Sequence, residues 1–186
     1  MNLDEKYQAV ISALKSENRA MVKLNAEDTL ELVNLWKNSI LDHQQNHGQT
    51  NQLKKIICVA SYSQKMMPEL QEYILLAMEL KNLSNDIIIF LLTCGQKHII
   101  DYYKLQGHKL PQPYLKALSK LFTAKEDDVL FWLLKSVQSI GRQNVYFKKE
   151  VANIKLGVLD IFSSKKRSIV TLIDELAKEW EKIPHQ

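Results

Sequence analysis

With 186 residues, 46% of them hydrophobic and 25% charged, the chain has the composition of an ordinary soluble protein with a sizeable core. Only 5 glycines and 4 prolines are present, which favours helices over strands. No apolar stretch reaches the roughly 18 residues of a membrane span, the N-terminus lacks the pattern of a signal peptide, and Cys58 and Cys94 have no paired spacing. We therefore expect a cytoplasmic protein with buried thiols, without disulfides and without membrane insertion.

The net charge of +4 is unevenly distributed along the chain. Residues 1–93 carry 9 basic and 11 acidic side chains, whereas residues 94–186 carry 16 and 10. The excess is concentrated between Lys97 and Arg167, with 14 basic and 6 acidic side chains. Such a segment can attract an acidic protein, nucleic acid or anionic lipid, or form a solvated face. Because nearly all of these cations are lysines, and arginine is preferred for bidentate recognition of bases and phosphates, an acidic protein is favoured.

Two helices are predicted at the N-terminus. Apolar residues from Leu3 to Leu14 recur at helical spacing and indicate the first. Asn25, followed three residues later by Asp28, gives a start signal for a second helix over residues 26–43. The polar stretch over residues 44–51 contains Gly48 and has no periodicity, so we expect an exposed loop there.

The middle of the chain predicts a hairpin and two further helices. An apolar helical face from Leu53 to Ala60 should end before Pro68, which suits the first turn of the next helix. The apolar run over residues 87–92 then predicts a helix that stops at Gly95. A short helix over residues 98–105 is expected to stop before Gly107 and Pro111.

An internal repeat is indicated by two six-residue apolar runs, 87–92 and 129–134, which lie 42 residues apart and each follow an aspartate. The same offset places apolar residues on apolar residues in the preceding helix, as for Tyr73 with Leu115 and Leu76 with Leu118. A weaker third copy places Leu156, Leu159 and Phe162 on residues 115, 118 and 121. A last helix over residues 168–183 has a polar outer face suited to capping an array.

In architecture and period, residues 68–183 resemble the HEAT and armadillo-like helical repeats. The resemblance implies a curved protein-binding scaffold. We therefore predict an all-α protein built as a helical-hairpin repeat array, a HEAT-like α-solenoid, with an irregular compact helical bundle as the alternative. The expected organisation is one domain over residues 1–186, with N-terminal helices over 1–43, an exposed loop over 44–51 and stacked hairpins over 52–183.

No sequence motif for catalysis, metal binding or phosphate binding is present, and no cofactor is predicted. His43 and His47 are four residues apart but lack a third ligand at a recognisable spacing. Cys94 and His98 have the same spacing, which Gly95 interrupts, so we expect a buried cysteine and a surface histidine. An enzyme reading would have to use scattered acid–base groups; the nearest available are His98, His108, Asp101 and Asp128.

Two short charged tracts have structural explanations. Three consecutive acids, Glu126-Asp127-Asp128, suit the positive end of a helix dipole. The tract Lys165-Lys166-Arg167 is expected in a linker between two helices, either solvated or with a localisation or phosphate-binding role.

The best candidate surface combines cations with aromatic residues at equivalent places in successive repeats. Tyr103 and Tyr146 are expected to plug the repeat interfaces, and Gln143 and Asn144 lie in the same region. The predicted binding surface consists of Lys104, Lys109, Tyr114, Lys116, Lys120, Arg142, Lys148 and Lys149. The functional hypothesis is a non-catalytic scaffold or adaptor that binds an acidic protein. The alternative is a nucleic-acid-binding protein that contacts phosphates without base specificity.

Overall fold

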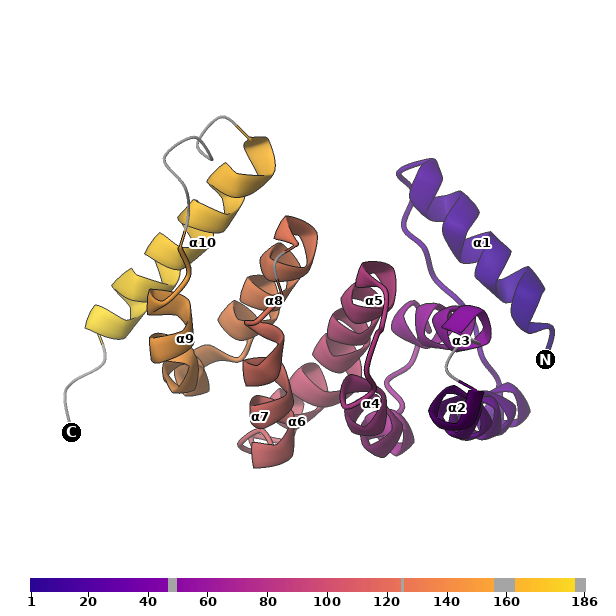
Figure 1. Cartoon of the computed structure of the whole chain (residues 1–186). Helices are drawn as coiled ribbons and strands as arrows, with labels where there is room; N and C mark the ends of the chain where they lie inside the picture. Colours follow the sequence, from indigo (N-terminus) through magenta and orange to yellow (C-terminus); the bar gives the residue numbers. More distant parts are fainter. Residues whose placement is uncertain (47–49, 125, 156–162, 183–186) are drawn as a thin grey trace. The chain divides into compact units, whose positions relative to one another are not determined.

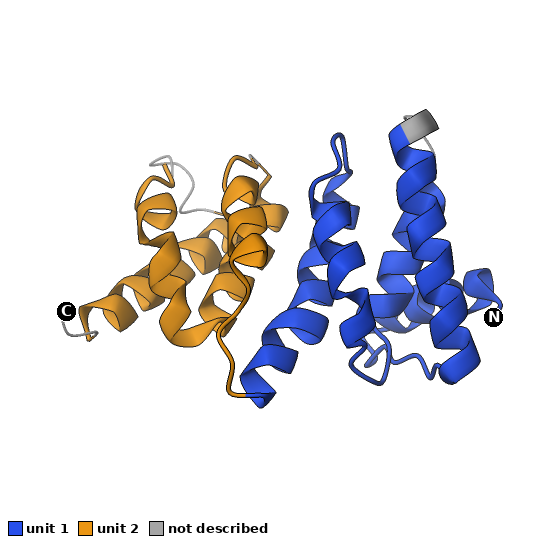
Figure 2. Cartoon of the chain, turned by 90° about the horizontal axis from the view of Figure 1, so that it is seen from below, with its two compact units in different colours: residues 1–106 blue, residues 107–186 orange. Residues whose placement is uncertain are grey.

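The computed structural model describes residues 1–46, 50–124, 126–155 and 163–182 (Figure 1). These residues form helices joined by short connections and no strand, which confirms the predicted all-α class. Whereas the sequence predicts one domain, the chain divides into two compact units, residues 1–106 and 107–186 (Figure 2). No helix within the described ranges is both long enough and apolar enough to cross a membrane.

The first unit consists of helices that pack around α3. Its elements are α1 (Leu3–Lys15), α2 (Ala26–Asn46), α3 (Thr50–Ser61), η1 (Pro68–Leu70), α4 (Gln71–Met78), α5 (Asn85–Gly95), η2 (Gln96–Asp101) and α6 (Tyr102–Leu105). The apolar faces of α3 and α5 meet in the core, where Ile57 and Leu92 are fully buried. At the edge of this contact, Lys54 pairs with Asp86 at 2.6 Å.

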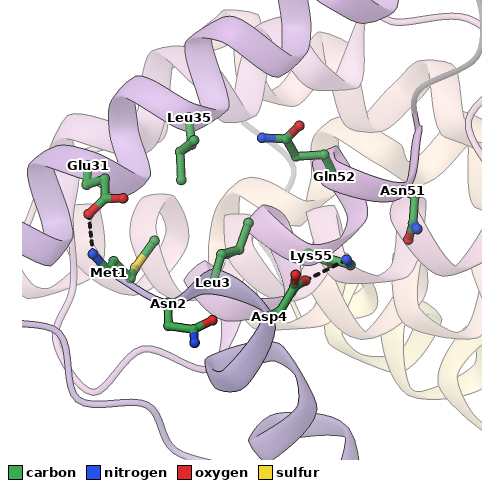
Figure 3. Close-up of a pocket in the computed structure, with 9 residues that line it drawn as sticks. All are labelled: Met1, Asn2, Leu3, Asp4, Glu31, Leu35, Asn51, Gln52 and Lys55. Atoms are coloured by element: carbon green, nitrogen blue, oxygen red, sulfur yellow. Dashed lines mark hydrogen bonds and ion pairs between the residues drawn. The ribbon is translucent and has the colours of Figure 1, made fainter.

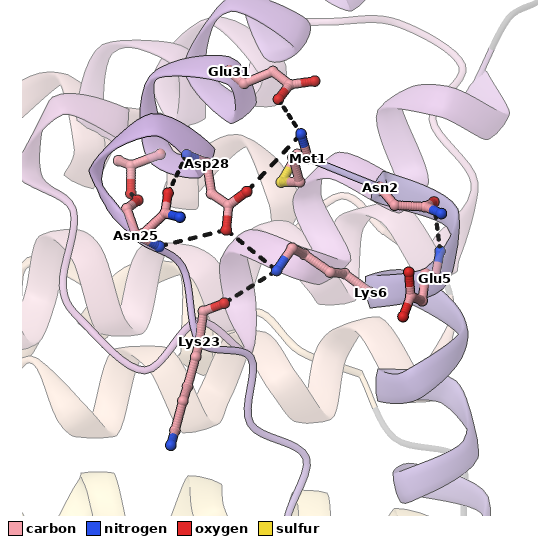
Figure 4. A network of polar contacts seen from close by, with 9 residues as sticks. Met1, Asn2, Glu5, Lys6, Lys23, Asn25, Asp28 and Glu31 are labelled. Atoms are coloured by element: carbon pink, nitrogen blue, oxygen red, sulfur yellow. Dashed lines mark hydrogen bonds and ion pairs between the residues drawn. The ribbon is translucent and has the colours of Figure 1, made fainter.

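The N-terminal helices begin at the predicted signals. Asn25 Oδ1 accepts a hydrogen bond from the Asp28 amide at 2.7 Å, which satisfies one of the free donors at the start of α2 (Figure 4). Asp28 also pairs with Lys6 of α1 at 3.3 Å, and Lys6 donates to the Lys23 carbonyl at 3.2 Å. The second helix start therefore also fastens α1 to the unit.

The predicted exposed loop over residues 44–51 is wrong at both ends. Helix α2 continues through Asn46, and α3 already begins at Thr50; residues 47–49 lie outside the described residues. Glutamine is a good helix former, and adding a residue to an existing helix is far easier than starting one. Helix α2 can therefore extend into a polar sequence that has no apolar period.

Helical structure also continues through Gly95, where the sequence predicts a stop. Residues 85–105 form one uninterrupted helical segment, with π-helical η2 between α5 and α6. Gly95 is buried, and tertiary packing overrides its weak propensity, which costs only about 1 kcal/mol relative to alanine. The segment ends before Gly107, whose φ of 67° lies in the left-handed region that glycine adopts without strain.

The second unit packs around α8 and α10. Its elements are α7 (Gln112–Leu121), α8 (Asp127–Ser139), η3 (Gly141–Phe147), α9 (Lys148–Ala152) and α10 (Ser164–Glu181). Figure 1 shows α10 alongside α8, and both helices contribute buried residues to the core, among them Leu133 of α8 and Leu172 of α10. Gly141, with a φ of 73°, turns the chain from α8 into η3.

The tract at residues 165–167 is helical rather than a linker. It forms the first turn of α10, where Lys165 pairs with Asp128 and Lys166 lies 3.8 Å from Asp127. The Lys165 ammonium also lies 5.3 Å from the centre of the Phe131 ring. The acids occupy the start of α8, as predicted, and two of them are paired with α10.

The repeat signal corresponds to a shared order of elements in the two units. A helix pair, a segment of irregular helix and a short helix form α4–α5–η2–α6 in the first unit and α7–α8–η3–α9 in the second. The 42-residue offset matches burial in the second helix of each pair, as for Leu92 and Leu134. In the first helix the offset of 42 is wrong: Leu76 is 43% exposed and Leu118 is buried. In this first helix, buried residues match at an offset of 41 residues, as for Ala77 and Leu118.

The predicted third copy of the repeat lies outside the described residues.

Candidate functional site

The exposed side of α7 carries two of the predicted lysines. Tyr114, Leu115 and Leu118 face the core of the second unit, whereas Lys116 and Lys120, one turn apart, lie on the opposite face. Tyr114 is fully buried, so its assignment to the binding surface is wrong. Its ring lies on the apolar face of the helix, at the spacing of the other core residues. The prediction of exposure relied on the neighbouring lysines and did not take this spacing into account.

Three contacts join α7 and the connection before it to η3 and α9. Ser119 Oγ donates to Glu150 Oε1 at 2.5 Å. The Phe122 and Phe147 rings stack, with their centroids 5.8 Å apart. The Leu110 amide donates to Gln143 Oε1 at 2.8 Å. Cations on these neighbouring elements therefore belong to one region of the second unit.

Six exposed cations of this region form what we call the basic surface. They are Lys109 before α7, Lys116 and Lys120 on α7, Arg142 on η3, and Lys148 and Lys149 on α9. Residues 107–155 contain 9 basic and 4 acidic side chains. Two of the acids pair with α10, and Glu150 accepts the Ser119 hydroxyl. Lys104, the remaining predicted cation, is exposed on α6 and belongs to the first unit.

Asn144 is a structural residue rather than part of a binding surface. Its side chain is fully buried, its Nδ2 donates to Glu179 Oε2 at 2.9 Å, and its Oδ1 accepts from Trp180 Nε1 at 2.8 Å. These two hydrogen bonds fasten η3 to α10 and so hold the basic surface on the core of the second unit.

The predicted plugging role is wrong for Tyr146, which is 40% exposed. Its neighbour Val145 is 46% exposed and was missed as a surface residue. Tyr103 of the first unit is half-buried and meets Tyr102 edge to face at 5.8 Å.

His98 is fully buried, so the prediction of a surface histidine is wrong, whereas Cys94 is buried as predicted. The Met67 amide donates to His98 Nδ1 at 2.9 Å, and His98 Nε2 donates to the Ala60 carbonyl at 3.0 Å. Burial lowers the pKa of His98 to about 4, with the nearby Lys97 charge acting in the same direction. The imidazole is therefore neutral at pH 7 and links α3 to the chain before η1.

The two acids and the two cysteines that the sequence offers for acid–base or thiol chemistry are held by hydrogen bonds, ion pairs or burial. Asp101 accepts a hydrogen bond from Gln96 at 2.8 Å, and Asp128 is paired with Lys165. Burial raises the pKa of the Cys58 thiol to about 12, and burial also raises the pKa of Cys94, which opposes thiolate chemistry.

The first unit contains an open cavity of about 790 Å³ beside the N-terminus (Figure 3). Leu3 and Leu35 contribute apolar surface, while Asp4 and Lys55 form an ion pair at 2.5 Å across part of the rim. Glu31 pairs with the amino group of Met1. The charged groups of this cavity are thus paired with one another.

A smaller cavity, of about 260 Å³, lies where α2 approaches the end of α4. His43 lines it, and its Nε2 donates to the Lys81 carbonyl at 3.1 Å. His47 lies outside the described residues. In the part of the chain that the structure describes, no three metal-binding side chains come together.

Comparison of the chain with protein-family models, with curated proteins and with solved structures found no match.

Proposed function

We propose that this protein is a non-catalytic interaction module whose basic surface binds an acidic segment of a partner protein. The observation that carries the proposal is the grouping of six exposed cations on α7, η3 and α9. Contacts between these elements hold the cations in one region, and three of the four acids of residues 107–155, namely Asp127, Asp128 and Glu150, bond to other side chains of the unit. An acidic segment would meet complementary charge there, which speeds encounter and selects the partner.

The recurring helix pair supports the wider proposal that the protein is a HEAT-like scaffold. A compact helical bundle would present the same basic surface, so binding does not depend on that choice. A cytoplasmic setting is part of the proposal and is supported by the two buried, unpaired cysteines.

The basic surface favours an acidic protein over nucleic acid because five of its six cations are lysines. Lysine presents a compact, hydrated charge that suits carboxylates on a flexible segment. Arginine, the residue that reads bases and grips phosphates in a bidentate manner, occurs once, at Arg142. Binding to nucleic acid is the competing outcome of the experiment below.

The test is the affinity of the whole chain for a fluorescent glutamate-rich peptide, measured by anisotropy at 50 and 300 mM salt. Reversing the charge of Lys116, Lys120, Lys148 and Lys149 to glutamate is expected to weaken binding at least about tenfold at 50 mM salt. Higher salt should weaken wild-type binding, because the attraction is between exposed charges.

The matched control reverses four exposed lysines of the first unit, namely Lys15, Lys23, Lys37 and Lys65. This variant has the same net charge but should retain most of the wild-type affinity. Equal losses in the two variants would show that only net charge matters and would overturn the assignment to the basic surface. Tight binding of a labelled oligonucleotide with no binding of the peptide would overturn the choice of partner.

A further inference from the structure

An exposed apolar pair lies inside the basic surface. Val145 and Tyr146 are 46% and 40% exposed, although most large apolar residues of the second unit are buried. They occupy η3 between two residues that must face inward: Asn144 bonds to α10, and Phe147 is fully buried against Phe122. Their exposure therefore follows from two fixed neighbours.

The geometry of η3 aligns this pair with cations. In a 3₁₀-helix, side chains three residues apart eclipse one another. Arg142 and Val145 of η3 therefore lie in one row, and Lys148, the first residue of α9, follows at the end of that row; all three side chains are exposed, in the order cation–apolar–cation. Gln143 and Tyr146 form the neighbouring row, and Lys149 of α9 follows them along the chain.

The row has a spacing that an extended peptide can match. At about 2 Å rise per residue along η3, Val145 lies about 6 Å beyond Arg142, and Lys148, directly after η3, lies about 12 Å beyond it. In an extended strand, residues i, i+2 and i+4 lie on one face, and the outer two are about 13 Å apart. Two acids flanking an apolar residue in this pattern would meet two cations and an apolar side chain.

We propose that the basic surface recognises an extended acidic peptide of the pattern acid–x–apolar–x–acid, with the apolar residue seated against Val145 and Tyr146. This inference rests on the proposed function and specifies its partner. A central apolar contact surrounded by charged groups is the arrangement that concentrates binding energy in protein interfaces. The cations steer the peptide, and the apolar residue fixes its register.

The test uses three peptides of equal length and net charge. The first contains Glu-Ser-Leu-Ser-Glu, the second replaces its leucine with alanine, and the third has the same residues as the first in a scrambled order with the acids adjacent. The wild-type protein should bind the first peptide about five- to tenfold more tightly than either of the others, because burying leucine contributes more than burying alanine and only the first pattern matches the row.

Protein variants identify the surface responsible. Val145→Ala with Tyr146→Ala should remove the preference for leucine while retaining attraction to acidic peptides. The single variant Val145→Ala, which spares the Tyr146–Phe147 ring contact, should reduce the preference without affecting folding. Leu30→Ala with Leu105→Ala, which trims two exposed leucines of the first unit, is the matched control and should keep the full preference.

The outcomes separate this inference from the proposed function. Equal affinity for all three peptides, together with loss of binding in the lysine charge-reversal variant, would overturn the inference and retain the proposed function. Absence of peptide binding would overturn both. Self-association of the wild type that Val145→Ala abolishes would assign the apolar pair to a second copy of the chain and would also overturn the inference.

Discussion

The first unit is expected to lose about 3 kcal/mol of stability as the pH falls from 6.5 to 4, owing to His98. In the unfolded chain its imidazole takes up a proton near pH 6.5, whereas burial holds the pKa in the folded unit near 4. Between these values the unfolded state binds more protons, so acidification favours unfolding. The stabilising effect is fully present above pH 6.5 and is lost progressively toward pH 4.

The local geometry explains why protonation is resisted. Nδ1 of His98 accepts the Met67 amide, and a proton on that nitrogen would place two donors against each other. Urea titrations at pH 4.5 and 7, with amide exchange of α3 peptides to identify the unit, measure the effect. His98→Gln should be less stable than wild type at pH 7 by about 2 kcal/mol and less sensitive to pH. An equal pH dependence in both proteins would show that other groups cause it.

The second large effect is expected from Asn144→Leu, which should destabilise the second unit by about 3 kcal/mol. Leucine has similar size but leaves the indole N–H of Trp180 without its acceptor and Glu179 without its donor. Both groups lie where η3 meets α10. We call the two hydrogen bonds of Asn144 the Asn144 clamp, and its loss should loosen the contact between η3 and α10. Asn38→Leu, at an exposed position of α2, is the matched control and should change stability by less than about 0.5 kcal/mol.

A double-mutant cycle with Trp180→Phe isolates the hydrogen bond. Because Phe lacks the indole donor, the double variant should cost about 1 to 2 kcal/mol less than the sum of the single variants. Urea unfolding gives the energies, and hydrogen exchange of α10 peptides assigns them to the second unit. Strict additivity would mean that the two side chains act independently and would refute the clamp.

The sequence predicts the helices of this chain largely because their start signals are local. Asn25 accepts a hydrogen bond from an amide within one turn, and the acids at residues 126–128 lie at the positive end of the dipole of α8, so both signals are visible in a few neighbouring residues. Pro68 opens a helical segment for the same reason. The apolar runs over residues 87–92 and 129–134 likewise predict α5 and α8.

The features that the sequence does not reveal depend on distant partners. His98 is buried because Ala60 and Met67 supply an acceptor and a donor, 38 and 31 residues away. Asn144 is buried because Trp180 meets it from 36 residues away. A polar residue without a visible partner is assigned to the surface by default, since burial without a hydrogen bond is costly.

The candidate site was predicted in its charge but not in its shape. Lys116 and Lys120 are exposed, in agreement with the apolar pattern of α7, which places them opposite its buried face. Lys148 and Lys149, which follow the buried Phe147, are also exposed. Val145 was not predicted as a surface residue, and Tyr146 was assigned to a repeat interface from its place in the repeat, whereas both are exposed in η3.

Binding at the basic surface is tested most directly by mapping amide chemical shifts while the whole chain is titrated with the Glu-Ser-Leu-Ser-Glu peptide. We expect the shifts to concentrate in residues 109–120 and 142–149, with the first unit largely unaffected. Shifts that concentrate around Leu3, Leu35 and Lys55, or shifts absent at a saturating peptide concentration, would contradict binding at the basic surface.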